Sequence, residues 1–254
     1  MGQTRDAAGA GSSSARVAFV VRVLARLLVG FGLVALSACF DEGKQSGPPK
    51  TVKVLVDITK STPPPLLQQY FDFVRDVIGR LQAQDRIQVF AITDAGFSRP
   101  QLLLKGTIPT DDRDLHPHIL AARESLVKQW YAVVDTLTPR YNITDVFGTI
   151  AYASEIFKGE AGVKRLYVLS DCRNSTSALN LEDMDVIDVE QAMNRLADAG
   201  LICDLRDVNL VFGLHTSSKD VRYHESMVRF LRAYADTTRA NLVDIRVDLN
   251  FSTW

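Results

Sequence analysis

Residues 51–62 read TVKVLVDITKST, a mostly apolar run that ends at an aspartate and is followed at once by hydroxyl side chains. The first seven residues have the character of a strand that is buried on both faces of a sheet. Asp57, Thr59 and Ser61 then place three oxygen-bearing side chains at alternate positions. Such a stretch indicates either a polar turn or a site for a hard metal ion, and the remaining sequence must distinguish the two.

Downstream of this stretch, segments with strand character alternate with segments with helical character. The predicted strands are 51–57, 86–92, 101–108, 165–171, 208–214 and 241–249. Apolar residues at helical spacing predict helices over 64–83, 112–136, 144–157, 186–199 and 227–238. This order predicts an α/β fold of three layers, in which helices flank a mostly parallel central sheet and segment 101–108 pairs at an edge.

The N-terminal segment carries the signs of export. An apolar run, LLVGFGLVALSA, follows several arginines and has the length of a signal-peptide core, shorter than a full membrane span. Its end, LSAC, resembles the lipobox of bacterial lipoproteins, which implies that Cys39 is lipidated. We expect a signal peptide over 1–38, a flexible tether over 39–50 and one domain over 51–254. An ordinary cleaved signal and a short membrane anchor remain alternatives.

Lipidation of Cys39 would anchor the protein to a membrane of the cell envelope, facing the periplasm or the exterior. The chain has 29 basic and 30 acidic residues and a net charge of -1, so the charge gives no reason to expect nucleic acid as a partner. After lipidation of Cys39, Cys172 and Cys203 are the cysteines left to pair. We expect them to lie near opposite ends of the sheet, too far apart for a disulfide.

Three loops carry the candidate chemistry, because each leaves the carboxyl end of a predicted strand or opens a helix on that side of the sheet. The first loop holds Asp57, Thr59 and Ser61, the second holds Thr144, and the third holds Asp171. Open parallel sheets place their binding crevice outside the carboxyl ends of the strands. We therefore expect these five side chains to gather around one point.

The pattern Asp57-x-Thr59-x-Ser61 with distant Thr144 and Asp171 resembles the metal-ion-dependent adhesion site (MIDAS) of von Willebrand factor type A domains. The resemblance in element order covers about 51–249. It implies a non-enzymatic module that binds Mg²⁺ or Mn²⁺ and engages a protein partner, which donates a carboxylate to the metal. It further implies that the three hydroxyls ligate directly or through water and that the two aspartates act largely through bound waters.

Elementary metal chemistry agrees with this resemblance. Mg²⁺ takes six oxygen ligands in near-octahedral geometry and usually keeps several waters beside one or two carboxylates. The chain has no Cys or His spacing typical of zinc. Cys172 stands where the family often has glycine after the third-loop aspartate, and we expect its side chain to narrow the rim of the site. Arg173, Asn174 and Asp145 border the site and are candidates for contact with a partner.

Simpler interpretations remain open at this point. Asp57 is also suited to cap its own turn, and Thr144 to be the N-cap of the following helix. A metal-free scaffold for envelope assembly would have the same fold. A phosphohydrolase with Asp57 as nucleophile is less favoured, because haloacid-dehalogenase-type enzymes carry a second acid two residues later, where this chain has Thr59.

Overall fold

The computed structural model describes residues 47–110, 116–214 and 221–246. The chain divides into two compact units, Met1–Gln45 and Ser46–Trp254, and all described residues belong to the second. The expected signal peptide, Cys39 and most of the tether lie outside the described residues, so these expectations stay predictions. Within the described ranges, no helix is both long and apolar enough to cross a membrane.

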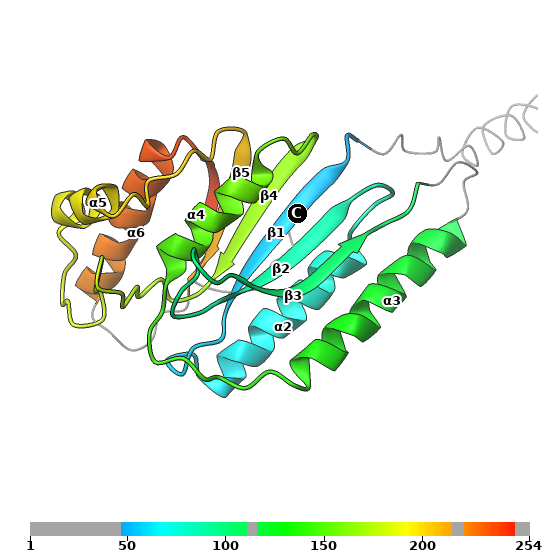
Figure 1. Cartoon of the computed structure of the whole chain (residues 1–254), viewed down its shortest axis with the longest axis horizontal. Helices are drawn as coiled ribbons and strands as arrows, with labels where there is room; N and C mark the ends of the chain where they lie inside the picture. Colours follow the sequence, from blue (N-terminus) through cyan, green and yellow to red (C-terminus); the bar gives the residue numbers. More distant parts are fainter. Residues whose placement is uncertain (1–46, 111–115, 215–220, 247–254) are drawn as a thin grey trace, which may run out of the picture. The chain divides into compact units, whose positions relative to one another are not determined.

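The core of the second unit is a six-stranded sheet with the order β3-β2-β1-β4-β5-β6 (Figure 1). The strands are β1 (Lys50–Asp57), β2 (Arg86–Ile92), β3 (Gln101–Thr107), β4 (Val163–Leu169), β5 (Val208–Gly213) and β6 (Asn241–Arg246). All neighbours are parallel except β3, which runs antiparallel to β2 at the edge. The predicted fold class and the edge position of the third strand are confirmed.

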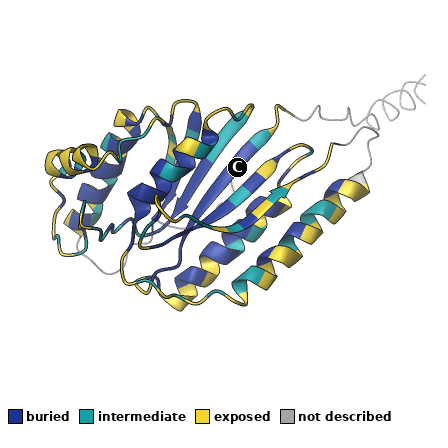
Figure 2. Ribbon diagram, in the orientation of Figure 1, coloured by how far each residue is buried: buried dark blue, intermediate teal, exposed yellow. Residues whose placement is uncertain are grey.

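Helices cover both faces of this sheet. They are α2 (Pro64–Gly79), α3 (His116–Val134), α4 (Val146–Phe157), α5 (Val189–Asp198) and α6 (Val221–Thr237). Alternate residues of β1 enter two cores: Val54 and Val56 pack with α2 and α3, whereas Leu55 packs with α4 and α6. β1 is buried along most of its length (Figure 2), which explains its nearly continuous apolar sequence.

α2 and α3 are joined by a specific aromatic contact. Trp130 is fully buried, its Nε1 donates a hydrogen bond of 3.0 Å to the carbonyl oxygen of Phe71, and the two rings meet edge to face at 5.7 Å. A buried tryptophan needs a partner for its N–H, and the α2 backbone provides it. This contact fixes α3 beside α2 on one face of the sheet.

The last helix begins earlier than the predicted 227, at Val221. Its first turns lack a clear apolar period and are held by polar contacts instead. The hydroxyl of Tyr223 donates to the carbonyl of Leu181 at 3.2 Å, and the hydroxyl of Ser226 accepts from the amide of Ile187 at 3.0 Å. Such contacts leave no hydrophobic periodicity in the sequence, so the start of this helix was predicted wrongly.

Candidate metal site at the carboxyl end of the sheet

Asp57 is the last residue of β1 and only 1% exposed. Its Oδ1 accepts hydrogen bonds from the amide of Thr59 at 3.0 Å and from the hydroxyl of Thr59 at 2.6 Å. Its Oδ2 accepts a hydrogen bond of 2.6 Å from the hydroxyl of Ser170. Asp57 therefore does cap its own turn, as the simpler interpretation has it. The same bonds also hold the carboxylate firmly beside the other predicted site residues.

The three predicted hydroxyls form a chain. The Oγ1 of Thr59 lies 2.8 Å from the Oγ of Ser61 and 3.2 Å from the Oγ1 of Thr144. A backbone bond of 2.9 Å from the amide of Lys60 to the carbonyl of Tyr141 ties the first loop to the second. Thr144 is 85 residues away from Thr59 in sequence, so the fold itself brings these oxygens together.

Thr144 is not the N-cap of α4. That position belongs to Asp145, whose Oδ1 accepts a hydrogen bond of 2.9 Å from the amide of Gly148. The hydroxyl of Thr144 points to Thr59 instead, and its amide donates to the Oγ of Ser175 at 2.8 Å. The interpretation of Thr144 as a helix cap alone is therefore wrong.

Asp171 lies two residues beyond β4, where it borders a cavity of about 120 Å³ that Ser61, Arg173 and Glu182 also line. Its Oδ1 accepts a hydrogen bond of 3.0 Å from the amide of Arg173, and its Oδ2 is 3.7 Å from the Nε of the same arginine. Burial, the nearby Asp57 charge and Glu182 raise the pKa of Asp171 to about 6, although Arg173 opposes them. The structure thus brings all five predicted residues together.

The charges of the site are arranged as a cation would require. Burial raises the pKa of Asp57, although hydrogen bonds from Ser170 and Thr59 counteract this. The two carboxylates repel each other in a weakly solvated place, so a bound cation would relieve both the burial and the repulsion. Among the described residues, no group of three or more His, Cys, Asp or Glu side chains is placed to hold a metal. The candidate site accordingly depends on hydroxyl oxygens beside the two carboxylates.

The spacing of the hydroxyls is that of a hydrogen-bonded chain, and it also lies in the range for oxygen ligands of one small dication. Mg²⁺ holds its ligands at about 2.0–2.1 Å in an octahedron, so neighbouring ligands lie roughly 3 Å apart. The separations of 2.8 and 3.2 Å between the oxygens of Thr59, Ser61 and Thr144 lie on either side of this value. The residues therefore suit a small, oxygen-preferring dication in both chemistry and spacing.

Of the three residues expected to border the site and contact a partner, Asn174 and Asp145 are buried inside the protein. Asn174 is fully buried, and its Oδ1 accepts a hydrogen bond of 2.9 Å from the amide of Val146 at the start of α4. Asp145 is also buried and accepts a hydrogen bond of 2.9 Å from Gly96. Both side chains hold the backbone around the second loop by hydrogen bonds, and neither lies on the protein surface where a partner would bind. Arg173, in contrast, lines the cavity next to Asp171.

Cys172 does not narrow the rim, because its side chain is fully buried in the core cluster that α4, α5 and α6 share with the sheet. Its φ of 57° is left-handed, a conformation in which glycine is unstrained. Cys172 and Cys203 are both free thiols, in agreement with the expectation that they do not pair.

Ser170 and Ser175 were missed by the sequence analysis. Val56 of β1 lies opposite Leu169 of β4, so Asp57 and Ser170 are the next residues along this register. Only the pairing register places Ser170 beside Asp57, and a lone serine at a strand end gives no signal of its own. Ser175 accepts a hydrogen bond from the amide of Thr144, and this contact could be predicted only if the third loop were known to pack against the second loop.

Asp57 is poorly placed as a nucleophile. Both of its oxygens accept hydrogen bonds, from Thr59 and from Ser170, and the side chain is almost inaccessible. A nucleophilic carboxylate needs an open approach to the reacting atom. The geometry therefore speaks against the phosphohydrolase interpretation.

The chain is similar to several solved protein structures. No family model matches the chain, and no curated protein matches it. A von Willebrand factor type A protein from Catenulispora acidiphila is similar in structure, with a TM-score of 0.45, 16% identity and coverage of 80% of this chain and 39% of that chain. The chain thus spans about two fifths of the length of that protein.

Two further similar structures carry metals by their descriptions. One is proximal thread matrix protein 1 from the mussel byssus, with a zinc-occupied MIDAS motif. It has a TM-score of 0.40 and 10% identity, with coverage of 81% of this chain and 43% of that one. Manganese-loaded TRAP from Plasmodium vivax has a TM-score of 0.39 and 12% identity, with coverage of 74% of this chain and 63% of that one. Structures similar to this chain therefore include von Willebrand factor type A proteins, the family whose adhesion-site pattern its sequence resembles.

Proposed function

We propose that this protein is a lipid-anchored binding module that engages a protein partner through a divalent cation, Mg²⁺ or Mn²⁺. The observation that carries the proposal is the convergence of Asp57, Thr59, Ser61, Thr144 and Asp171 from three loops onto one edge of the sheet. These five residues would hold the cation. The lipid anchor at Cys39 is proposed from the LSAC sequence alone.

The form of the site supports a role in binding. Asp57, Thr59 and Thr144 are about 1% exposed and form the buried part of the site, whereas Ser61 and Asp171 line a cavity that is open to solvent. A cation held between these oxygens would supply a concentrated positive charge at the mouth of this cavity. An acidic side chain of a partner is the natural ligand for such a charge, because Mg²⁺ prefers carboxylate oxygens.

Calorimetric titration with Mg²⁺ and with Mn²⁺ tests the cation. We expect the wild-type protein to bind both and Asp57→Asn to lose binding, because the amide removes the charge at nearly constant size. Asp85→Asn is the matched control, since Asp85 is also buried (2% exposed) but precedes β2 at the other end of the sheet. Undiminished binding by Asp57→Asn, with its fold verified by circular dichroism, would contradict the proposal.

The partner and the anchor need separate tests. A partner captured from envelope extract in Mg²⁺ should be released by a chelator, and Asp57→Asn should fail to capture it. A metal-free scaffold would instead hold the same partner in both conditions. Cys39→Ala should move the protein from the membrane fraction to the soluble fraction; retention of this variant in the membrane would contradict lipidation at Cys39.

A further inference from the structure

Tyr70 of α2 carries a buried polar atom that the fold leaves unpaired. Its side chain is 0% exposed, yet its hydroxyl has no hydrogen-bond partner among the residues that the structure describes. A buried polar group without a partner costs free energy, so nearly all such groups in folded proteins bond to protein atoms or to water. The hydroxyl of Tyr70 therefore requires a partner other than these residues.

The geometry of α2 directs this side chain toward the candidate metal site. α2 begins at Pro64, three residues after Ser61 (Figure 1), and its residue Leu66 lines the same cavity as Ser61 and Asp171. Tyr70 follows Leu66 by four residues, so the two side chains lie on one face of the helix, one turn apart. Side chains of a helix lean toward its N-terminus, and a tyrosine is long enough to span one turn of about 5.4 Å. The hydroxyl of Tyr70 thus reaches back toward the buried side of this cavity.

The surroundings of Tyr70 agree with this direction. Tyr70 belongs to the same core cluster as Val56 and Ile58, the two residues on either side of Asp57. Burial raises the pKa of Tyr70 well above its ordinary value, and the charges of Asp57 and Asp171 raise it further. The phenol therefore keeps its proton, so it is a hydrogen-bond donor, and it lies near both carboxylates.

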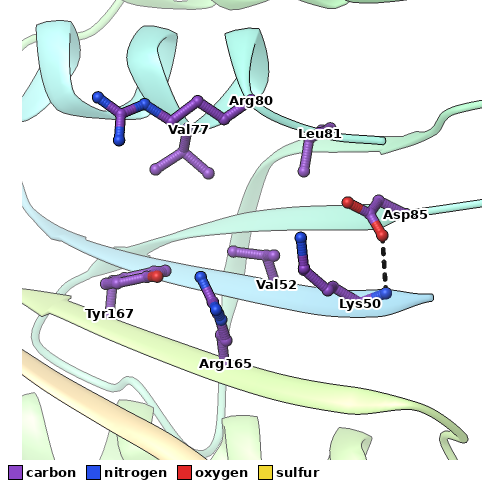
Figure 3. A pocket seen from close by; sticks show the side chains of 8 residues that line it. All are labelled: Lys50, Val52, Val77, Arg80, Leu81, Asp85, Arg165 and Tyr167. Atoms are coloured by element: carbon purple, nitrogen blue, oxygen red, sulfur yellow. Dashed lines mark hydrogen bonds between the residues drawn. The ribbon is translucent and has the colours of Figure 1, made fainter. Parts of the chain in front are cut away.

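A second cavity, of about 320 Å³, borders the other end of α2 (Figure 3). It lies at the amino end of the parallel strands, where Val77 and Leu81 line it on the side of the helix and Lys50 on the side of the sheet. Tyr70 is not part of this lining and precedes Val77 by seven residues, or about two helical turns. Of these two cavities, the one at the carboxyl end of the sheet is therefore the one that can supply a partner to Tyr70.

We propose that Tyr70 is a positioning residue of the candidate metal site, whose hydroxyl donates a hydrogen bond to a water molecule shared with the carboxylates of Asp57 and Asp171. This inference rests on the proposed cation-dependent function. Both oxygens of Asp57 already accept direct hydrogen bonds, from Thr59 and from Ser170, and a bridging water adds the phenol to this arrangement. Such a water accepts one hydrogen bond and donates two, which is the number of partners typical of buried water. It holds the two carboxylates in position for the cation.

Calorimetric titration of the full chain with Mn²⁺ tests the role of Tyr70. We expect Tyr70→Phe to bind Mn²⁺ about tenfold or more weakly than the wild type, because supporting contacts of metal ligands typically contribute this much. Tyr234→Phe is the matched control. Tyr234 is also fully buried, but it lies in the core on the other face of the sheet, and its hydroxyl donates to the carbonyl of Leu201 at 3.2 Å. This variant should keep the wild-type affinity.

Urea unfolding in chelator gives a second readout on the same variants. Tyr70→Phe should lose less stability than Tyr234→Phe, because only Tyr234 gives up a hydrogen bond to a protein group. An equal loss of stability would mean that the hydroxyl of Tyr70 already bonds to the protein, and it would overturn the inference.

The outcomes separate this inference from the proposed function. If the wild type binds Mn²⁺ and folded Tyr70→Phe binds it equally well, the inference is overturned while the proposed function stands. If the wild type does not bind Mn²⁺, the proposed function fails and this inference fails with it. Equally weakened binding by Tyr70→Phe and Tyr234→Phe would mean that a general loosening of the core is responsible, which also overturns the inference.

Discussion

The two ends of the sheet differ in chemistry although the same strands build both. At the carboxyl end, β1 and β4 lead into Asp57 and Asp171, surrounded by hydroxyl oxygens. At the amino end, β1 begins with Lys50 and β4 carries Arg165. The carboxyl edge thus gathers carboxylate and hydroxyl oxygens, whereas the amino edge carries basic side chains.

Strand geometry keeps these two ends apart. Lys50 and Asp57 are seven steps apart along β1, which at roughly 3.3 Å per residue is about 23 Å. At an effective dielectric constant of about 20, the attraction between two unit charges over this distance is below about 1 kcal/mol. The comparison teaches that one short strand can carry opposite charges at its two ends, and that a variant at one end should leave the other unchanged.

The largest effect at the carboxyl end is expected for Asp171→Asn. We expect the affinity for Mn²⁺ to fall at least about 100-fold, because a carboxylate of the proposed site is lost. Calorimetry measures this constant, and circular dichroism verifies the fold of the variant. Undiminished affinity in a folded Asp171→Asn protein would remove this carboxylate from the site.

Lys53 lies within β1, between its two ends, and carries an ionisable group into the protein interior. It is fully buried, donates to Gln88 at 2.8 Å and lies 4.2 Å from the ring centre of Phe157. Burial lowers the pKa of Lys53 from 10.5 to about 8, although Glu160 opposes this. From pH 8 to 10.5 the unfolded chain keeps a proton that the folded protein loses, so stability rises with pH in this window.

Lys53→Met removes that titration. The wild type should gain about 2 kcal/mol in unfolding free energy relative to Lys53→Met between pH 8 and pH 10.5. Urea unfolding at both pH values gives the difference, in which other titrating groups largely cancel. A difference that does not change with pH would mean that Lys53 keeps its ordinary pKa in the folded state.

The carboxyl end should show the opposite dependence on pH when the protein is free of metal. The pKa of Asp171 is raised from 3.8 to about 6, so the folded protein binds this proton more tightly than the unfolded chain does. Stability therefore falls as the pH rises from about 4 to 6. In chelator, the protein should be more stable at pH 5 than at pH 7 by roughly 1 to 2 kcal/mol relative to Asp171→Asn. Equal pH profiles of the two proteins would contradict this.

Ser170→Ala should have a moderate effect on the cation. The hydroxyl of Ser170 holds the Oδ2 of Asp57 at 2.6 Å, and loss of such a supporting contact typically costs about tenfold or more in metal affinity. Ser154→Ala offers a control, since Ser154 is equally buried but bonds within α4 to the carbonyl of Ala151. Unchanged affinity in Ser170→Ala would remove this serine from the site.

Thr59→Ser should have the smallest effect. It keeps the hydroxyl that links Asp57, Ser61 and Thr144, so we expect a change of less than about threefold in Mg²⁺ affinity. Thr59→Val, which keeps the shape but loses the oxygen, should weaken binding far more. Equal affinities for these two variants would show that the hydroxyl does not act on the metal.

The fold could be predicted because its signals are local. The apolar runs of β1, β4 and β5 and the helical period of α2 are properties of neighbouring residues, and strand 86–92 was predicted with its observed bounds. The start of α6 could not be predicted, since its contacts are polar and reach the segment around Leu181 and Ile187. The spacing of apolar residues indicates which side chains face a hydrophobic core, but it gives no information about polar contacts.

The site could be predicted only in part for a related reason. Asp57, Thr59 and Ser61 share one turn and form a recognisable spacing, and Thr144 and Asp171 follow from the rule that strands point to a common edge. Ser170 depends on the register between β1 and β4, whose contact joins residues 113 positions apart. The burial of Asn174 and Asp145 likewise depends on how the three loops stack on one another.

Cys172 offers a built-in chemical reporter of motion at the carboxyl end. Its thiol follows Asp171 directly, is fully buried and has a pKa raised well above its ordinary value by burial and by the charges of Asp171 and Asp57. A thiol-specific reagent reaches it only when the third loop opens, so its labelling rate in a chain with the other cysteines replaced measures how often that loop departs from its folded position. Saturating Mg²⁺ would slow this labelling if the cation ties the loop to the turn after β1.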